Sequence, residues 1–192
     1  NNIQKLIFVS TCSNYGLIAE NITADENYKL EPLSLYAKSK VKIEKYILSL
    51  KGKTSLEPTI LRFATAFGLS PRMRFDLTIN QFTKEIKEGN KLKIYDANTW
   101  RPYCHVLDFS YLIKKVLNSP KDKVSFQIFN AGGDQNNFSK KMIIDEILKL
   151  NLLGKVEFLK DDIDPRNYKV NFSKVRKVLN FKIKHSIVDG IK

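Results

Sequence analysis

The stretch KLIFVSTCSNYG, residues 5–16, is a short run of apolar and β-branched residues that stops at a group of small, turn-forming ones. Such a run is typical of a strand buried on both faces, as the strands of parallel sheets are. The residues that follow, from Cys12 to Gly16, predict a turn directly after the strand. We therefore expect residues 5–11 to form one strand of a parallel sheet, with Thr11 at its end.

Strands and helices alternate along the rest of the chain. TILRFATAFG, residues 59–68, is a second run of the buried-strand type. Apolar residues recur at helical spacing from Tyr36 to Leu50, and residues 75–89 form an amphipathic pattern that ends at Gly89. Further strands are expected at 92–96, 101–108, 126–133 and 155–159, and further helices at 109–118, at 139–150 with Ser139 as the N-cap, and at 173–179. This alternation predicts an α/β fold with a mostly parallel sheet.

The size and composition of the chain fit a protein with one main core. Its 192 residues, 43% of them hydrophobic, suffice for one sizeable core or for one domain with a small appendage. The sequence has no run of eighteen apolar residues and no apolar signal segment near its first residue, so we expect neither a membrane span nor a secretory leader. The two cysteines, Cys12 and Cys104, match no metal-binding spacing, and a reducing cytoplasmic location is the expectation.

The net charge of +13 admits a nucleic-acid-binding domain as one interpretation. Most of the basic residues are lysines scattered over predicted outer helix faces, without a basic tail, so solubility accounts for them and no nucleic-acid partner is expected. The arginines are more informative, because Arg62, Arg72, Arg74 and Arg101 fall at or near predicted strand ends and loops. The planar guanidinium of arginine suits phosphate better than the point charge of lysine does.

The segment LEPLSLYAKSK, residues 30–40, places Tyr36 and Lys40 four residues apart at the start of a predicted helix. This spacing puts both side chains on one face of the helix. A phenol ionises at about pH 10, and a neighbouring ammonium favours the phenolate, so a tyrosine beside a lysine can exchange a proton with a sugar hydroxyl or a carbonyl. A hydroxyl at the end of a neighbouring strand, such as Thr11, would share that proton and hold the substrate oxygen. The spacing alone is common by chance, and the neighbouring motifs give it weight.

Five motifs occur in order along nearly the whole chain: IFVSTCSNYG, SLYAKSKVKIEKYI, PTILRFATAFG, RPYCHVLDFSYLI and FQIFNAGG. Together they resemble the extended short-chain dehydrogenase/reductase family, and within it the nucleotide-sugar epimerases and dehydratases. The resemblance implies a Rossmann-type parallel sheet with a small substrate-binding domain. It also implies NAD as the cofactor and a nucleotide-diphosphate sugar as the substrate.

The resemblance assigns roles to the residues around the Tyr–Lys pair. Tyr36 would be the catalytic acid/base, and Lys40 would tune it and hold the nicotinamide ribose. Thr11 matches the catalytic Ser/Thr of the family, since it precedes the family's Tyr-Gly pair at residues 15–16. Phe63 is expected to join these three residues in the cofactor site.

The resemblance also implies a substrate site. Arg101 matches an arginine that commonly contacts the nucleotide-sugar diphosphate, and Arg72 and Arg74 lie in the loop where the substrate-binding part begins. Arg62 opens a stretch resembling the family pattern R-x-x-N-x-Y-G, in which Thr65 stands at the position of the usual Asn. Thr65 is therefore expected at the substrate, although its contact differs from that of the family.

Two further positions narrow the activity. The 4,6-dehydratases of the family carry acidic residues just after the catalytic Thr, where this chain has Cys12 and Ser13. This favours an epimerase or a 4-dehydrogenase-type oxidoreductase over a dehydratase. Cys12 is interpreted as a small buried thiol, because the family's cysteine-using epimerases have their cysteine one position later. His105, inside a predicted strand, is expected to be structural.

The sequence contains no Gly-rich nucleotide-binding turn. Its eight glycines, at positions 16, 52, 68, 89, 132, 133, 154 and 190, form neither G-x-G-x-x-G nor a near variant. The resemblance therefore implies that the chain corresponds to the C-terminal two-thirds of a family member, without the adenosine and pyrophosphate site. The choice between NAD and NADP stays open for the same reason. A catalytically inactive family fragment is the main alternative function.

The expected division assigns residues 1–66 and 101–133 to an incomplete NAD-binding sheet, and residues 67–100 and 134–192 to a substrate-binding portion. An incomplete sheet exposes an edge strand and apolar surface, so we expect the isolated chain to associate or to be poorly soluble. The resemblance also makes the helix that carries Tyr36 a candidate contact in a homodimer.

Overall fold

The computed structural model describes residues 3–19, 21–150, 154–159 and 166–192. Its main sheet consists of three parallel strands in the order β1–β3–β7: β1 spans Lys5–Thr11, β3 spans Glu57–Phe63 and β7 spans Gln127–Ala131. The central strand β3 is buried along nearly its whole length, as expected for a strand with parallel neighbours on both sides. The register aligns the carboxyl ends of the three strands, with Phe63 between Thr11 and Ala131.

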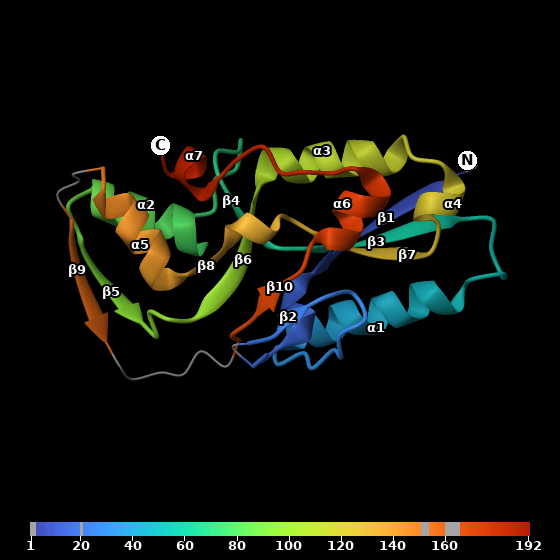
Figure 1. Ribbon diagram of the computed structural model, residues 1–192, viewed down its shortest axis with the longest axis horizontal. Helices are drawn as coiled ribbons and strands as arrows, with labels where there is room; N and C mark the ends of the chain where they lie inside the picture. Colours follow the sequence, from blue (N-terminus) through green and yellow to red (C-terminus); the bar gives the residue numbers. More distant parts are fainter. Residues whose placement is uncertain (1–2, 20, 151–153, 160–165) are drawn as a thin grey trace.

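Two helices lie on opposite sides of this sheet in Figure 1: α1, Leu35–Ser49, and α3, Val106–Leu117. Ser34 begins α1 as its N-cap, because its hydroxyl accepts a hydrogen bond from the N–H of Ala37. α1 buries Ala37, Val41 and Ile47 at helical spacing and packs against β1. The helix therefore runs along the strand that ends at Thr11.

The run TILRFATAFG forms two strands and not one. β3 ends at Phe63, and the N–H of Ala64 donates to the carbonyl of Ala131 over 3.0 Å. β4, Thr65–Phe67, then pairs in parallel with β6, Trp100–His105, which also pairs in antiparallel with β8, Asn137–Ser139. One strand-like segment of sequence thus serves two sheets.

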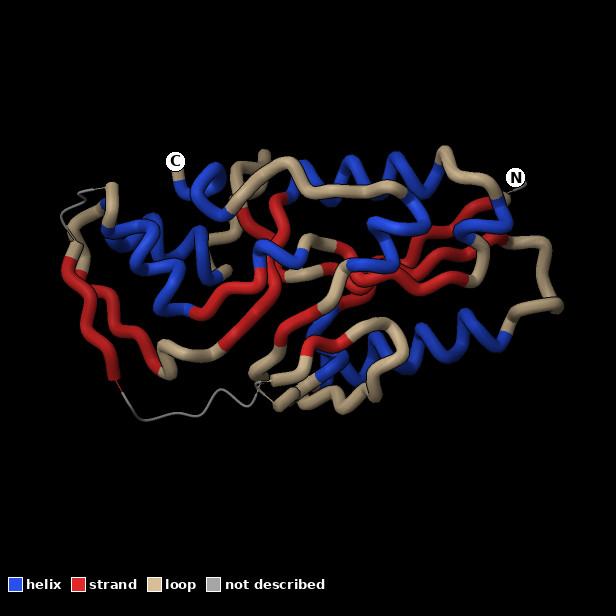
Figure 2. The backbone as a smooth tube through the Cα atoms, in the orientation of Figure 1, coloured by secondary structure: helices blue, strands red, loops and turns tan. Residues whose placement is uncertain are grey.

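A second group of elements lies at the other end of the molecule (Figure 2). It contains α2 (Thr78–Lys87), α5 (Lys140–Leu148), α7 (Ile187–Ile191) and the parallel pair β5 (Lys91–Tyr95) and β9 (Lys155–Leu159). These elements bury a hydrophobic cluster of their own, with Phe67, Ile86 and Ile144 among its fully buried members. The main sheet has a separate cluster around Leu61 and Phe129.

Shorter elements complete the fold: η1 (Cys12–Tyr15), α4 (Lys121–Val124), η2 (Asp134–Asn136), α6 (Ser173–Leu179), and the parallel pair β2 (Thr23–Ala24) and β10 (Lys169–Val170). β10 and α6 pack into the cluster around the main sheet, whereas α5 and α7 pack into the second cluster. The predicted division into a cofactor-binding and a substrate-binding portion stays a prediction.

Apart from the division of 59–68 into two strands, the predicted elements agree with the structure except at some of their ends. The expected helix at 139–150 is confirmed as α5, and the Ser139 hydroxyl caps it by accepting from the N–H of Met142. The expectation that 101–108 is extended throughout is wrong at its end, because residues 106–108 form the first turn of α3. The α/β class with mainly parallel strands is confirmed.

Among the described strands, β1 forms one edge of the main sheet. Leu6 and Val9 on this strand are 40% and 49% exposed. Exposed apolar side chains on an unpaired edge strand favour association with other chains. The expected association of the isolated chain therefore keeps its physical basis and stays a prediction.

Candidate functional site

The candidate site lies at the carboxyl ends of β1 and β3. Thr11 and Phe63 are the last residues of these strands and stand opposite each other in the parallel register. Thr11 is 9% exposed, and its hydroxyl accepts a hydrogen bond from the N–H of Ser13 over 3.1 Å, which caps η1. In parallel sheets, ligands bind beyond the carboxyl ends of the strands, where these two residues lie.

α1 brings Tyr36 and Lys40 to the same strand. Lys40 Nζ donates to the carbonyl of Val9 over 2.8 Å, two residues before Thr11. The same ammonium lies 5.6 Å from the ring centroid of Tyr36 and 4.9 Å from that of Phe8. Tyr36 is 56% exposed in the first turn of the helix, so its phenol is open to a ligand.

Arg62 is fully engaged inside the protein. Its guanidinium is 3% exposed, and Nη2 lies 2.7 Å from a carboxylate oxygen of Glu44, which is 2% exposed. Arg62 Nη1 donates to the hydroxyl of Tyr15 and to the carbonyl of Glu26. Burial opposes the charge of Arg62, but the hydrogen bonds and charge of Glu44, together with Tyr15, raise its pKa overall. Arg62 is thus an internal connection between α1, β3 and η1.

The hydrogen bonds of Arg62 continue to β7. The Tyr15 hydroxyl donates to Asn130 Oδ1 over 2.6 Å, and the N–H of Asn130 donates to Glu26 Oε1 over 2.7 Å. Burial raises the pKa of both Tyr15 and Glu26. The Tyr15 phenol therefore stays protonated and serves as a hydrogen-bond donor from η1 to β7.

The ring of Tyr168 lies between Arg101 and the turn that follows Thr11. Arg101 is 8% exposed, and its guanidinium carbon lies 5.0 Å from the ring centroid of Tyr168. The hydroxyl of Tyr168 lies 3.2 Å from Ser13 Oγ, and burial raises the pKa of this phenol. Arg101 is therefore linked to Ser13 of η1 through its cation–π contact with Tyr168 and the hydrogen bond between Tyr168 and Ser13.

The other predicted substrate residues lie along the segment that leaves the main sheet. Thr65 is half-buried at the start of β4, beside Tyr103 of β6. Arg72 and Arg74 lie exposed in the loop between β4 and α2. Arg74 forms a forked ion pair with Asp76, and this pair raises the pKa of Arg74.

Cys12 and His105 have structural environments. Cys12 is 1% exposed, its thiol donates to the carbonyl of Arg62, and burial raises its pKa far above the ordinary value of 9.0. A thiol held so strongly in the protonated form fits the predicted structural role. His105 is buried at the end of β6, and its Nδ1 accepts from the N–H of Leu107 at the start of α3.

Sequence reasoning missed Glu44, which connects most of the polar groups beneath the site. A signal for it was available, because Glu44 follows the buried Ala37 and Val41 at helical spacing. An acid on the apolar face of a helix needs buried partners. The link from Ser13 to Tyr168 spans 155 residues and had no local signal.

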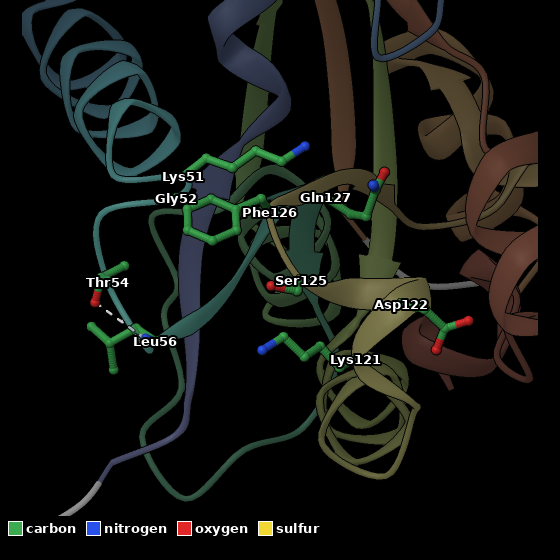
Figure 3. A pocket seen from close by; sticks show the side chains of 9 residues that line it. All are labelled: Lys51, Gly52, Thr54, Leu56, Lys121, Asp122, Ser125, Phe126 and Gln127. Atoms are coloured by element: carbon green, nitrogen blue, oxygen red, sulfur yellow. Dashed lines mark hydrogen bonds between the residues drawn. The ribbon is translucent and has the colours of Figure 1, made fainter.

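A surface pocket of about 420 Å³ lies at the other end of the main sheet (Figure 3). The loop after α1, the α4 segment and the first residue of β7 line it, with Lys51, Phe126 and Gln127 among the side chains. None of the site residues predicted from the sequence lines this pocket.

Among the described residues, no helix is long and apolar enough to cross a membrane.

The fold and the Tyr–Lys pair define a class of protein. Residues 1–132 match the model of the NAD dependent epimerase/dehydratase family, and the chain belongs to this family. The predicted family resemblance and the Rossmann-type fold are thereby confirmed.

Several named enzymes are similar to this chain in sequence or in structure. The chain is 32% identical over 139 residues to a UDP-glucuronate 4-epimerase of Thermodesulfobacterium geofontis, a match that covers 68% of this chain and 40% of the relative. The structure of UDP-glucuronic acid 4-epimerase from Bacillus cereus, in complex with UDP-glucuronic acid and NAD, superimposes on the whole chain with a TM-score of 0.86 at 25% identity. A dTDP-glucose 4,6-dehydratase from Bacillus anthracis in complex with NAD matches 97% of the chain with a TM-score of 0.83 at 26% identity.

The chain spans only part of these relatives. It covers 60% of the Bacillus cereus structure and 59% of the Bacillus anthracis structure.

Proposed function

We propose that the polypeptide containing this chain is an NAD-dependent nucleotide-sugar epimerase or a 4-dehydrogenase-type oxidoreductase. Membership of the epimerase/dehydratase family supports the reaction class. The relatives named as UDP-glucuronate 4-epimerases make a UDP-linked uronic acid the first substrate to test. Cys12 and Ser13 follow Thr11 where the dehydratases carry acidic residues, which favours epimerisation or oxidation at C4 over loss of water.

One observation carries the proposal: α1 holds Tyr36 and Lys40 against the strand that ends at Thr11. In its phenolate form, the exposed side chain of Tyr36 takes the proton of the sugar 4-hydroxyl as the hydride leaves C4. The ammonium of Lys40, 5.6 Å from the ring centroid, stabilises the negative charge of that phenolate before the proton arrives. Thr11 orients the same sugar hydroxyl.

NAD, when bound, accepts the hydride from C4 of the sugar and can return it to the opposite face of the resulting ketone. The proposed nicotinamide site combines an ammonium, a hydroxyl and an aromatic side chain: Lys40 Nζ bonds the carbonyl of Val9 on β1, and Thr11 and Phe63 end two neighbouring parallel strands. In the proposal, Lys40 hydrogen-bonds the ribose, while Thr11, Tyr36 and Phe63 line the nicotinamide site.

Four residues are proposed for the nucleotide-diphosphate sugar. Arg101, Arg72 and Arg74 supply positive charge, which suits the diphosphate. Thr65 would hydrogen-bond a sugar hydroxyl or the uronate carboxylate. Arg74 can exchange its exposed partner Asp76 for an anionic substrate group at little cost, because water and salt screen an ion pair between exposed side chains.

A catalytically inactive fragment is the second candidate, and the absence of a Gly-rich turn from the sequence favours it. Calorimetric titration of this 192-residue chain with NAD tests whether the chain alone holds a cofactor site. We expect no binding at micromolar concentrations, because the pyrophosphate site is missing from the chain. Micromolar binding by the chain alone would overturn that expectation.

The full-length gene product tests the proposed activity. Tyr36→Phe is expected to abolish turnover of UDP-glucuronic acid while leaving its binding within about 3-fold, because only the acid/base hydroxyl is removed. Tyr46→Phe is the matched control, since Tyr46 lies in the same helix and is 65% exposed. Wild-type rates from Tyr36→Phe would refute the assignment of the acid/base.

A further inference from the structure

The carboxylate of Glu44 accepts hydrogen bonds from three residues beneath the site. It is 2% exposed and accepts from Ser10 Oγ and from Asn14 Nδ2, the latter over 2.9 Å. Arg62 donates from Nε to both oxygens over 3.1 Å and from Nη2 to Oε2 over 2.7 Å. Oε1 is therefore held by three residues, and Oε2 is held by Arg62.

The donors to Glu44 come from the elements that carry the proposed catalytic groups. Ser10 directly precedes Thr11 on β1, and Asn14 lies in η1, whose N-cap is Thr11. Arg62 directly precedes Phe63 on β3. One carboxylate thus binds side chains from both sides of Thr11 and from the residue before Phe63 on β3.

Glu44 belongs to the helix that supplies the other half of the site. It lies four residues after Lys40 and eight after Tyr36 in α1, which corresponds to about 6 Å and 12 Å along the helix axis. A shift of α1 relative to β1 would therefore move Tyr36 and Lys40 together with respect to Thr11. The Glu44 hydrogen bonds oppose such a shift, because each has a directional donor fixed on another element.

We propose that Glu44 is a positioning residue that sets the distance and orientation of the Tyr36–Lys40 pair relative to Thr11. The inference rests on the proposed function of these three residues. Stability alone is a weak reason for a buried ion pair, because its desolvation penalty often equals or exceeds the attraction between the charges. Positioning is a stronger reason, since a displacement of about 1 Å in an active site can cost on the order of 100-fold in rate.

The test uses Glu44→Asp in the full-length gene product. This variant keeps the charge and withdraws the carboxylate by one carbon–carbon bond, so its donors must move or lose contact. We expect kcat to fall by about 10- to 100-fold with KM for the nucleotide sugar within about 2-fold. Glu88→Asp, an exposed glutamate at the end of α2, is the control and should change neither value.

A second variant separates positioning from folding. Glu44→Leu combined with Arg62→Met removes both buried charges and is expected to recover thermal stability relative to Glu44→Leu alone. It should not recover kcat, because the ties to Ser10 and Asn14 are still absent. Recovery of kcat in parallel with the melting temperature would overturn the positioning role.

Hydrogen exchange supplies a measurement that needs no activity. In Glu44→Asp, the amides of residues 11–15 and 35–43 should exchange faster together, while those of β5 and β9 stay unchanged. Unchanged exchange in either of the first two segments overturns the inference, even if the wild-type protein shows no turnover and the proposed function fails. Normal turnover in Glu44→Asp overturns it as well, whereas a normal rate in Tyr36→Phe refutes the proposed function instead.

Discussion

Gly68 occupies a position where a single methyl group should be costly. Its φ of +94° is in the region that L-residues rarely adopt, and a Cβ built there would lie 2.0 Å from Nε2 of His105. The His105 ring cannot easily retreat, because it stacks on His185 at 4.5 Å and meets the edge of Phe67 at 5.3 Å. The other ring nitrogen of His105, Nδ1, accepts a hydrogen bond from the N–H of Leu107 and so caps the start of α3. Gly68→Ala must therefore distort a buried junction.

The magnitude follows from two separate contributions. The positive φ costs an alanine about 1–2 kcal/mol, and overpacking against a held ring adds about 1–3 kcal/mol. Gly52→Ala isolates the first contribution, since Gly52 has a φ of +78° and nothing within 4 Å of its built Cβ. We expect Gly68→Ala to lower the free energy of unfolding by about 2–5 kcal/mol and Gly52→Ala by about 1–2 kcal/mol.

The assay is urea unfolding of the full-length gene product followed by circular dichroism, with both variants compared with wild type. The difference between the two variants reports the contact with His105. A difference of less than about 0.5 kcal/mol would refute the reasoning, because it would leave no cost for the overlap with the ring.

Three further predictions follow from buried and edge groups. Cys12 and Cys104 are each 1% exposed and burial raises the pKa of both thiols, so neither should react with a thiol reagent in the folded protein; rapid reaction without denaturant would contradict this. Burial, and to a lesser extent the neighbouring His185, lower the pKa of His105 below its ordinary value of 6.5. As the pH drops, the unfolded chain therefore binds a proton at this residue before the folded protein does. The free energy of unfolding should fall below about pH 6.5. His105→Asn keeps a side-chain acceptor that can cap α3. Between pH 7 and pH 5, the urea midpoint of this variant should fall less than that of the wild-type protein. Equal falls would contradict His105 as the source of the pH dependence. The isolated 192-residue chain should elute as associated species in size-exclusion chromatography because the β1 edge exposes Leu6 and Val9, and a sharp monomer peak would argue against this.

Local sequence patterns predicted the elements that position the site. The run at 5–11 corresponds to β1 and the helical spacing after Tyr36 to α1. The expected burial of β1 on both faces is wrong, because Leu6 and Val9 on this edge strand are exposed. The break at Ala64 was not predicted, because residues on both sides of it are equally strand-like. The exit from the main sheet depends on Ala64 bonding to Ala131 and on β4 pairing with β6, which are long-range contacts.

The candidate site was predictable only in part for the same reason. Thr11, Tyr36 and Lys40 could be named from spacing and family resemblance, and the structure places them on adjoining elements. The supporting groups could not be named, because Glu44 finds its partners on β1, η1 and β3, and Tyr168 meets Ser13 from the far end of the sequence. Such partners follow from tertiary packing and leave little trace in local periodicity.

The most direct test of the central claim follows a deuterium label at C4 of the nucleotide sugar. The full-length gene product is incubated with C4-deuterated UDP-glucuronic acid, and the 4-epimer is analysed by mass spectrometry and NMR. The account predicts that the wild-type product retains deuterium at C4, that Tyr36→Phe forms no product, and that Tyr46→Phe behaves as wild type. Loss of the label to solvent, or undiminished product from Tyr36→Phe, would contradict hydride transfer at C4 with Tyr36 as the acid/base.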